Sequence, residues 1–144
     1  MRYLCLFYID QSLADAASKE EWAEIDRESL ASNEELKRSG HYLASNALAD
    51  PKTAKTLRIR AGKASWSDGP FAETKELVAG YWLWEVKSKT EAIEWVKRCP
   101  NPMPGDSEIE IRQIYGAEDF GEAFTPDLKA QEERMRAEIA AKNK

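Results

Sequence analysis

The chain has 144 residues, a formal net charge of −5 and a pI of about 5.1, with 42% hydrophobic and 33% charged residues. This length fits one domain that buries its own core, and this composition excludes a disordered chain. The negative charge argues against a polyanionic partner, so we expect no nucleic acid; no apolar run is long enough to span a bilayer, so we expect no membrane partner.

The few cysteines and the single histidine limit the kinds of metal, disulfide and cofactor site that the chain can form. The two cysteines, Cys5 and Cys99, indicate reduced thiols, and the N-terminus lacks a signal-peptide pattern, so we expect a cytoplasmic protein. A single histidine cannot supply an ordinary multi-histidine metal site, and no phosphate loop or dinucleotide fingerprint occurs. We therefore expect no metal and no cofactor.

The first elements are predicted from apolar runs and capping signals. Residues 2–9 are apolar or aromatic, apart from Arg2, and predict a central strand buried on both faces. Ser18 and Glu21 form a capping box that begins a helix, and Gly40 ends it.

The middle of the chain is predicted to be mostly strand. Residues 41–48 form a strand, and residues 53–59 and 64–67 form a hairpin whose Arg58, Arg60 and Lys63 we interpret as a solvated face in preference to a nucleic-acid site. Residues 77–86 form a further strand, in which Gly80 marks a bulge or a close backbone approach.

The last elements complete the pattern. Ser88 and Glu91 make a second capping box, whose helix ends at Cys99 and Pro100. Residues 108–114 alternate between apolar and charged side chains, which predicts a strand. We expect a domain of residues 1–116, followed by a charged helical extension, residues 117–144, whose helix begins at Pro126.

This order of elements predicts an α+β fold, a ferredoxin-like split βαβ plan with an inserted hairpin and a C-terminal helix. Two helices cover only one face of such a sheet. We expect the other face to carry Trp82 or its neighbours with Glu110 and Arg112, and to pack against a second copy in a homodimer. The cleft between the copies is a natural place for a small ligand. Trp82 and Trp84 share one strand face, and we interpret them as core or dimer interface in preference to a stacking platform.

Residues 68–76, with the sequence DGPFAETKE, are the most informative segment. Gly69 and Pro70 exclude helix and strand there, and three carboxylates and a lysine lie close together. This run resembles the signature of the DGPF, or YCII-related, family of small bacterial proteins, and the resemblance extends over residues 2–114. Gln113 departs from the pattern, because relatives frequently have proline there.

The resemblance implies a ferredoxin-like fold assembled as a dimeric α+β barrel. It implies less about activity. Some members of the wider group carry a His–Asp pair proposed as catalytic, a relative is linked to dehydrochlorination of an aromatic ring, and other members accompany sigma factors.

Two residues are candidates for catalysis. His41 is a general base if Asp68 fixes its tautomer; otherwise it is a hydrogen-bonded histidine at a strand end. Asp68 is either that partner or the residue that forms its own turn. Phe71 is interpreted as a core anchor, and Cys5 as buried and inert.

Three further residues are candidates for substrate binding. Glu73 is a possible site carboxylate, and Lys75 either holds an anionic group or makes a surface ion pair. Arg112 either clamps a carboxylate or pairs with Glu110 within the sheet.

Three functions therefore stay open. The first is a small-molecule enzyme of lyase or isomerase type, in which His41 moves a proton and Asp68 orients it. The second is a non-catalytic dimeric module that binds a small anionic or aromatic ligand or a regulatory protein, with sigma-factor regulation as one setting. In the third, the signature only forms a turn.

Overall fold

The fold is described from a computed structural model that covers residues 1–71 and 77–142. The chain divides into two compact units, Met1–Gln113 and Ile114–Lys144, each of which is described by itself.

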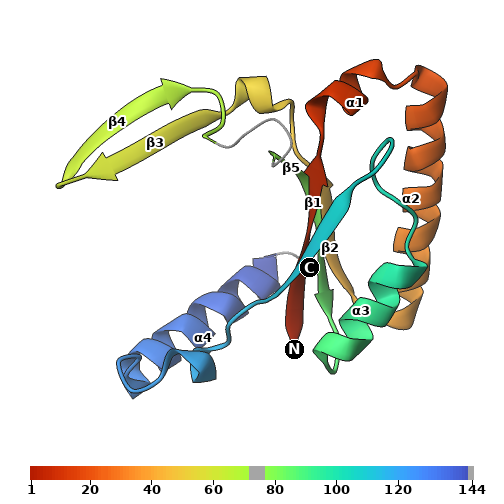
Figure 1. Ribbon diagram of the computed structural model, residues 1–144. Coiled ribbons are helices and arrows are strands. Elements are labelled where there is room, and N and C mark those ends of the chain that lie inside the picture. Colours follow the sequence, from red (N-terminus) through yellow and green to blue (C-terminus); the bar gives the residue numbers. More distant parts are fainter. Residues whose placement is uncertain (72–76, 143–144) are drawn as a thin grey trace. The chain divides into compact units, whose positions relative to one another are not determined.

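The first unit is built on a four-stranded antiparallel sheet in the order β2-β5-β1-β6 (Figure 1). Its strands are β1 (Arg2–Ile9), β2 (Tyr42–Ala47), β5 (Leu77–Glu85) and β6 (Glu108–Gln113). With helices after β1 and after β5, this is the ferredoxin-like split βαβ plan with a hairpin inserted after β2. The predicted fold class is confirmed.

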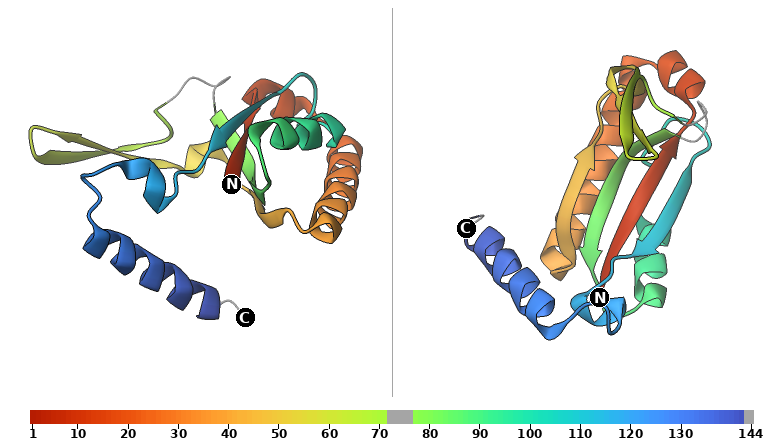
Figure 2. Two further views of the ribbon diagram at one scale, coloured as in Figure 1. Left: turned by 90° about the horizontal axis from the view of Figure 1, so that it is seen from below. Right: turned by 90° about the vertical axis from the view of Figure 1, so that its left-hand side faces the viewer.

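Both long helices cover the same face of this sheet (Figures 1 and 2). They are α2 (Lys19–Ser39) and α3 (Lys89–Arg98), and a short helix α1 (Gln11–Ala16), capped by Asp10, precedes them. The predicted capping box of Ser18 and Glu21 starts α2, and Gly40 ends it with a positive φ of 80°. No helix in the described residues is both long and apolar enough to cross a membrane.

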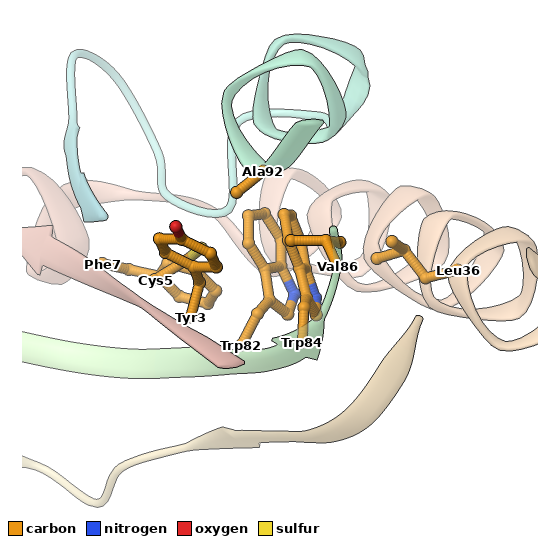
Figure 3. Packing of buried hydrophobic residues seen from close by; sticks show 8 residues of the cluster. All are labelled: Tyr3, Cys5, Phe7, Leu36, Trp82, Trp84, Val86 and Ala92. Atoms are coloured by element: carbon orange, nitrogen blue, oxygen red, sulfur yellow. The ribbon is translucent and has the colours of Figure 1, made fainter. Parts of the chain in front are cut away.

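The core lies between the sheet and these helices (Figure 3). Tyr3, Cys5, Trp82 and Trp84 are at most 1% exposed, and the two indole rings stack with centroids 5.2 Å apart. Burying such large aromatic side chains contributes strongly to the stability of the domain.

Trp82 belongs to the core, one of the two roles left open for it, and its neighbours Tyr81 and Leu83 lie on the uncovered face. Burial along β1 alternates strictly instead of extending over both faces, and Tyr3 and Cys5 pair with Trp84 and Trp82 on the helix-covered side. The opposite face, here called the open face, carries Leu4, Leu6, Tyr81, Leu83, Glu110 and Arg112. Strand periodicity groups side chains by face but does not say which face the helices cover.

Gly80 has the role predicted for it. A Cβ atom at this position would lie 2.7 Å from the backbone oxygen of Asn46 and 3.3 Å from the Phe7 ring. The register between β1 and β5 also shifts after Phe7, the residue paired with Gly80. The missing side chain thus allows β2 to approach β5 closely.

The inserted hairpin forms a separate two-stranded sheet, β3 (Lys55–Arg60) and β4 (Lys63–Asp68), preceded by a 3-10 turn η1 (Pro51–Thr53). We call residues 55–68 the hairpin arm. Ala61 and Gly62, both with positive φ, make the two-residue turn between Arg60 and Lys63. In Figures 1 and 2 the arm extends from the sheet on the side away from α2 and α3.

The second unit contains a 3-10 turn η2 (Ala117–Phe120) and a helix α4 (Pro126–Lys142). The helix begins at Pro126, as predicted. Its apolar residues Leu128, Met135 and Ile139 are exposed.

Candidate functional site

His41 follows the Gly40 cap and contacts helix α3 on the helix-covered side of the sheet. Its ring lies edge-on to Trp95, with centroids 5.5 Å apart, and Nε2 lies 3.5 Å from Oε1 of Glu91. Its Nδ1 lies 2.9 Å from the carbonyl oxygen of Glu85. Because a carbonyl only accepts, Nδ1 carries the proton of this hydrogen bond.

These contacts engage both ring nitrogens of His41 within the protein. One nitrogen is bonded to the main chain and the other faces a carboxylate. A general base needs a nitrogen within hydrogen-bond reach of the proton that it removes. The arrangement fits the alternative left open by the sequence, a hydrogen-bonded histidine at a strand end.

Glu91 is the partner that sequence reasoning missed. We interpreted it as half of a capping box with Ser88, and its amide does donate to the Ser88 hydroxyl, at 3.2 Å. Its carboxylate, however, accepts from the amide of Lys87 at 2.7 Å and turns its other oxygen toward His41. The capping pattern is a local signal, whereas the approach of His41 depends on the tertiary fold.

Asp68 ends the hairpin arm and is 84% exposed along its side chain. It forms an ion pair with Lys55, its cross-strand partner. The next residue closes the base of the arm, because the Gly69 amide donates to Ala54 O at 2.8 Å and the Thr56 hydroxyl donates to Gly69 O at 2.7 Å. Asp68 is therefore the last residue of β4, and its carboxylate pairs with Lys55 across the strands instead of capping the turn that follows.

The chain does not bring His41 and Asp68 together. The main chain of His41 pairs with Glu85, at the last residue of β5, whereas Pro70 and Phe71 share a pocket with Leu77, at the first. Nine residues of strand span about 26 Å, at roughly 3.3 Å per residue. The prediction of a direct contact is thus not met within one protomer. The catalytic roles of the two residues stay predictions.

The predicted binding residues are scattered. Glu73 and Lys75 lie outside the described residues. Arg112 lies on the open face of the sheet, with its Nε 3.6 Å from the carboxylate of Glu110. The same carboxylate accepts from the Tyr8 hydroxyl at 3.3 Å. Arg112 thus shows the intra-sheet ion pair that we considered beside a carboxylate clamp.

Pro70 and Phe71, just after Asp68, instead border an apolar cavity of about 380 Å³, here called the sheet-end pocket. Its walls come from the end of β2, the η1 turn, the Gly-Pro-Phe bend and the start of β5. The lining residues are Leu48, Ala49, Asp50, Pro51, Thr53, Ala54, Pro70, Phe71, Leu77 and Val78. The apolar members of this lining are the groups that bind small organic molecules.

The two polar side chains in this lining are already engaged. The Asp50 carboxylate accepts from the Lys52 amide at 2.8 Å, and the Thr53 hydroxyl donates to the Asp50 carbonyl at 2.7 Å. Both bonds hold the η1 turn in place. A ligand in the sheet-end pocket therefore meets mainly carbon surface.

Phe71 corrects a further expectation. We interpreted it as a core anchor, but its ring is 82% exposed and lies at the rim of the sheet-end pocket. The sequence around Phe71 has no apolar periodicity, so it does not indicate whether the ring is buried or exposed. An aromatic ring held in solvent beside a concave apolar surface is more typical of a binding site than of a core.

The two thiols do not form a reactive centre. Burial, with a smaller contribution from Cys99, raises the pKa of Cys5 to about 12, and burial also raises the pKa of Cys99. Both groups therefore stay protonated near neutral pH and are poor nucleophiles, as predicted for Cys5. Among the described residues, no group of three acidic, histidine or cysteine side chains is placed to hold a metal ion.

Comparison with known proteins identifies a family for this chain. A family model described as the YCII-related domain matches residues 1–116. An uncharacterized protein of Rhizobium meliloti is 34% identical over 114 residues, which cover 79% of this chain and 92% of that protein.

One solved structure is also similar, at a lower level. It is a 5-chloro-2-hydroxyhydroquinone dehydrochlorinase from Burkholderia phenoliruptrix in complex with 2,5-dihydroxybenzoquinone. It is 17% identical, covers 82% of this chain and 98% of its own, and has a TM-score of 0.43. A likeness at this level does not indicate a shared substrate or reaction.

Proposed function

The chain belongs to the YCII-related family, and we propose that it binds a small, mostly apolar molecule in the sheet-end pocket. The observation that supports this most is the cavity itself, which Pro70 and Phe71 border. Its volume of about 380 Å³ falls within the usual range for small-ligand sites. It is large enough for one substituted aromatic ring.

The lining favours an aromatic ligand over a polar one. Pro51, Pro70 and Phe71 present flat carbon surfaces, and aromatic rings pack well against such surfaces. A strongly polar ligand would lose hydration and find few hydrogen-bonding side chains in exchange, because Asp50 and Thr53 are the two polar side chains of the described lining and each already makes a bond within the η1 turn.

This proposal corresponds to the binding-module hypothesis. That hypothesis required a well-formed cleft without an aligned acid and base, and the sheet-end pocket with His41 at the other end of β5 supports it. The binding of a regulatory protein, including a sigma factor, stays a prediction.

An enzymatic function is the second candidate, and the Lys55–Asp68 ion pair favours it. Lys55 follows Ala54 in the chain, and Asp68 precedes Pro70 by two residues, and both Ala54 and Pro70 line the pocket. A lyase or isomerase built on this pocket would use Asp68 with Lys55, and His41 would have a supporting structural role.

We also propose that the open face packs against a second copy in a homodimer. Leu4, Leu6 and Leu83 give that face an apolar centre, and Glu110 with Arg112 gives it a polar edge. An apolar centre with a polar rim is the usual anatomy of an interface. Light scattering coupled to size-exclusion chromatography tests this, and a monomer at every concentration would contradict it.

Ligand-observed NMR with phenol, cyclohexanol and lactate as probes tests the binding proposal. We expect phenol to bind, cyclohexanol to bind more weakly and lactate not to bind. Phe71→Ala should weaken phenol binding several-fold, because it removes one wall of the sheet-end pocket.

The matched control is Trp66→Ala, since Trp66 is a similarly exposed aromatic residue, 71% against 82%, that does not line the pocket. Equal losses in both variants, or binding of lactate alone, would reject the proposal. If phenol binds, conversion of related ring compounds that depends on Asp68 would favour the enzyme.

A further inference from the structure

The hairpin arm has two chemically different faces. Leu57 and Trp66 are cross-strand partners, as are Ile59 and Ala64, so these four side chains share one face. The opposite face is polar and cationic and carries Thr56, Arg58, Arg60, Lys63, Ser65 and Ser67. This alternation is normally found where one face of a sheet is covered.

The apolar face of the arm is nevertheless exposed. Ile59 is 70% exposed, Trp66 71% and Leu57 42%. The arm forms its own two-stranded sheet and shares no strand pairing with the four-stranded sheet. A two-stranded hairpin is only marginally stable alone in water, and a cluster of exposed apolar residues indicates a partner surface.

The charge of the arm indicates what that partner is. Residues 55–68 contain four cations and one carboxylate, a net charge of +3. Since the whole chain has a net charge of −5, the rest of the chain carries −8. An arm placed on the body of a second copy therefore meets opposite charge, whereas two arms placed on each other would repel.

We propose that the hairpin arm clasps the body of a second copy of this chain, with Leu57, Ile59 and Trp66 in contact with it and the cations of the opposite face attracted by its net negative charge. A twofold axis makes the exchange reciprocal, so that each copy gives one arm and receives one. The arm extends away from α2 and α3, toward the side on which the open face lies (Figures 1 and 2). The contact thus adds a second surface to the proposed open-face dimer.

Sedimentation analysis of the full chain tests this proposal. The double variant Ile59→Asp with Trp66→Asp should weaken self-association about tenfold or more, because it places carboxylates in the apolar contact. Leu30→Asp is the matched control, since Leu30 is an equally exposed apolar residue on α2, at 66%. This control should leave the dissociation constant unchanged. Raising the salt concentration should weaken the wild-type association, because charge complementarity is screened.

A photoreactive p-benzoylphenylalanine in place of Trp66 gives an independent measurement. We expect a cross-linked product of twice the chain mass. Wild-type sedimentation as a monomer, an unchanged dissociation constant in the double variant, or cross-links only within one chain would each overturn the proposal. If Leu83→Asp separates the copies while the arm variant does not, the open face alone holds them and the clasp is wrong.

Discussion

The four-stranded sheet and the hairpin arm alternate apolar and polar side chains with the same period, yet their environments are opposite. In β1 and β5 the apolar face is covered by α2 and α3, and Trp84 is fully buried. In the arm the equivalent face leaves Trp66 71% exposed. The difference shows that one sequence pattern can either bury its apolar face or leave it exposed, and that the covering helices decide which of the two happens.

The sharpest test of this comparison replaces one tryptophan of each region by alanine. Trp84→Ala should lower the free energy of unfolding by about 3–5 kcal/mol, because it removes a fully buried ring and leaves a cavity. Measured on protein diluted until the chain is monomeric, Trp66→Ala should change it by roughly 0.5 kcal/mol or less, as exposed positions do. Urea denaturation of both variants measures the difference. Equal losses would show that the arm belongs to the same cooperative core.

A second test concerns the close approach of β2 and β5, which the arm does not share. Gly80→Ala should cost about 1–3 kcal/mol, because the new Cβ would lie 2.7 Å from a backbone oxygen that cannot rotate away. The thermal unfolding midpoint measures this cost. A variant as stable as the wild type would mean that β2 moves away from the new Cβ atom without a loss of stability, and that the close approach is not required.

The smallest expected effect concerns the start of α2, the helix that makes the two regions different. The backbone amide and hydroxyl of Ser18 lower the pKa of Glu21 below its ordinary value of 4.5. A lowered folded-state pKa contributes stability above the ordinary value, and this contribution is lost as the pH falls through the folded-state value. Glu21→Ala should therefore destabilise the protein slightly at pH 7 and progressively less below about pH 4.5.

Thermal unfolding as a function of pH measures this trend. Glu20→Ala is the control, since it removes a carboxylate from the same helical turn that is not part of the capping box. A gap between Glu21→Ala and the wild type that stays constant down to pH 3 would contradict the assigned role of the Ser18 bonds.

Several features of the fold could be predicted from the sequence because their causes are local. Ser18 and Glu21 satisfy amides of their own helix end, and Gly40 adopts a positive φ whatever surrounds it. Helix and strand periods then yield the order of elements, and that order restricts the topology to a few choices. The run at residues 68–76 also indicated the family, and residues 1–116 match its model.

Contacts between distant segments were decided only by the tertiary structure. His41 faces Glu91 and not Asp68, Trp82 lies under the helices, and Phe71 stands in solvent at the rim of a pocket. Each of these depends on which face of the sheet the helices cover and at which end of β5 a segment lies. Local propensity is identical for the alternatives, so only the packing of the whole domain separates them.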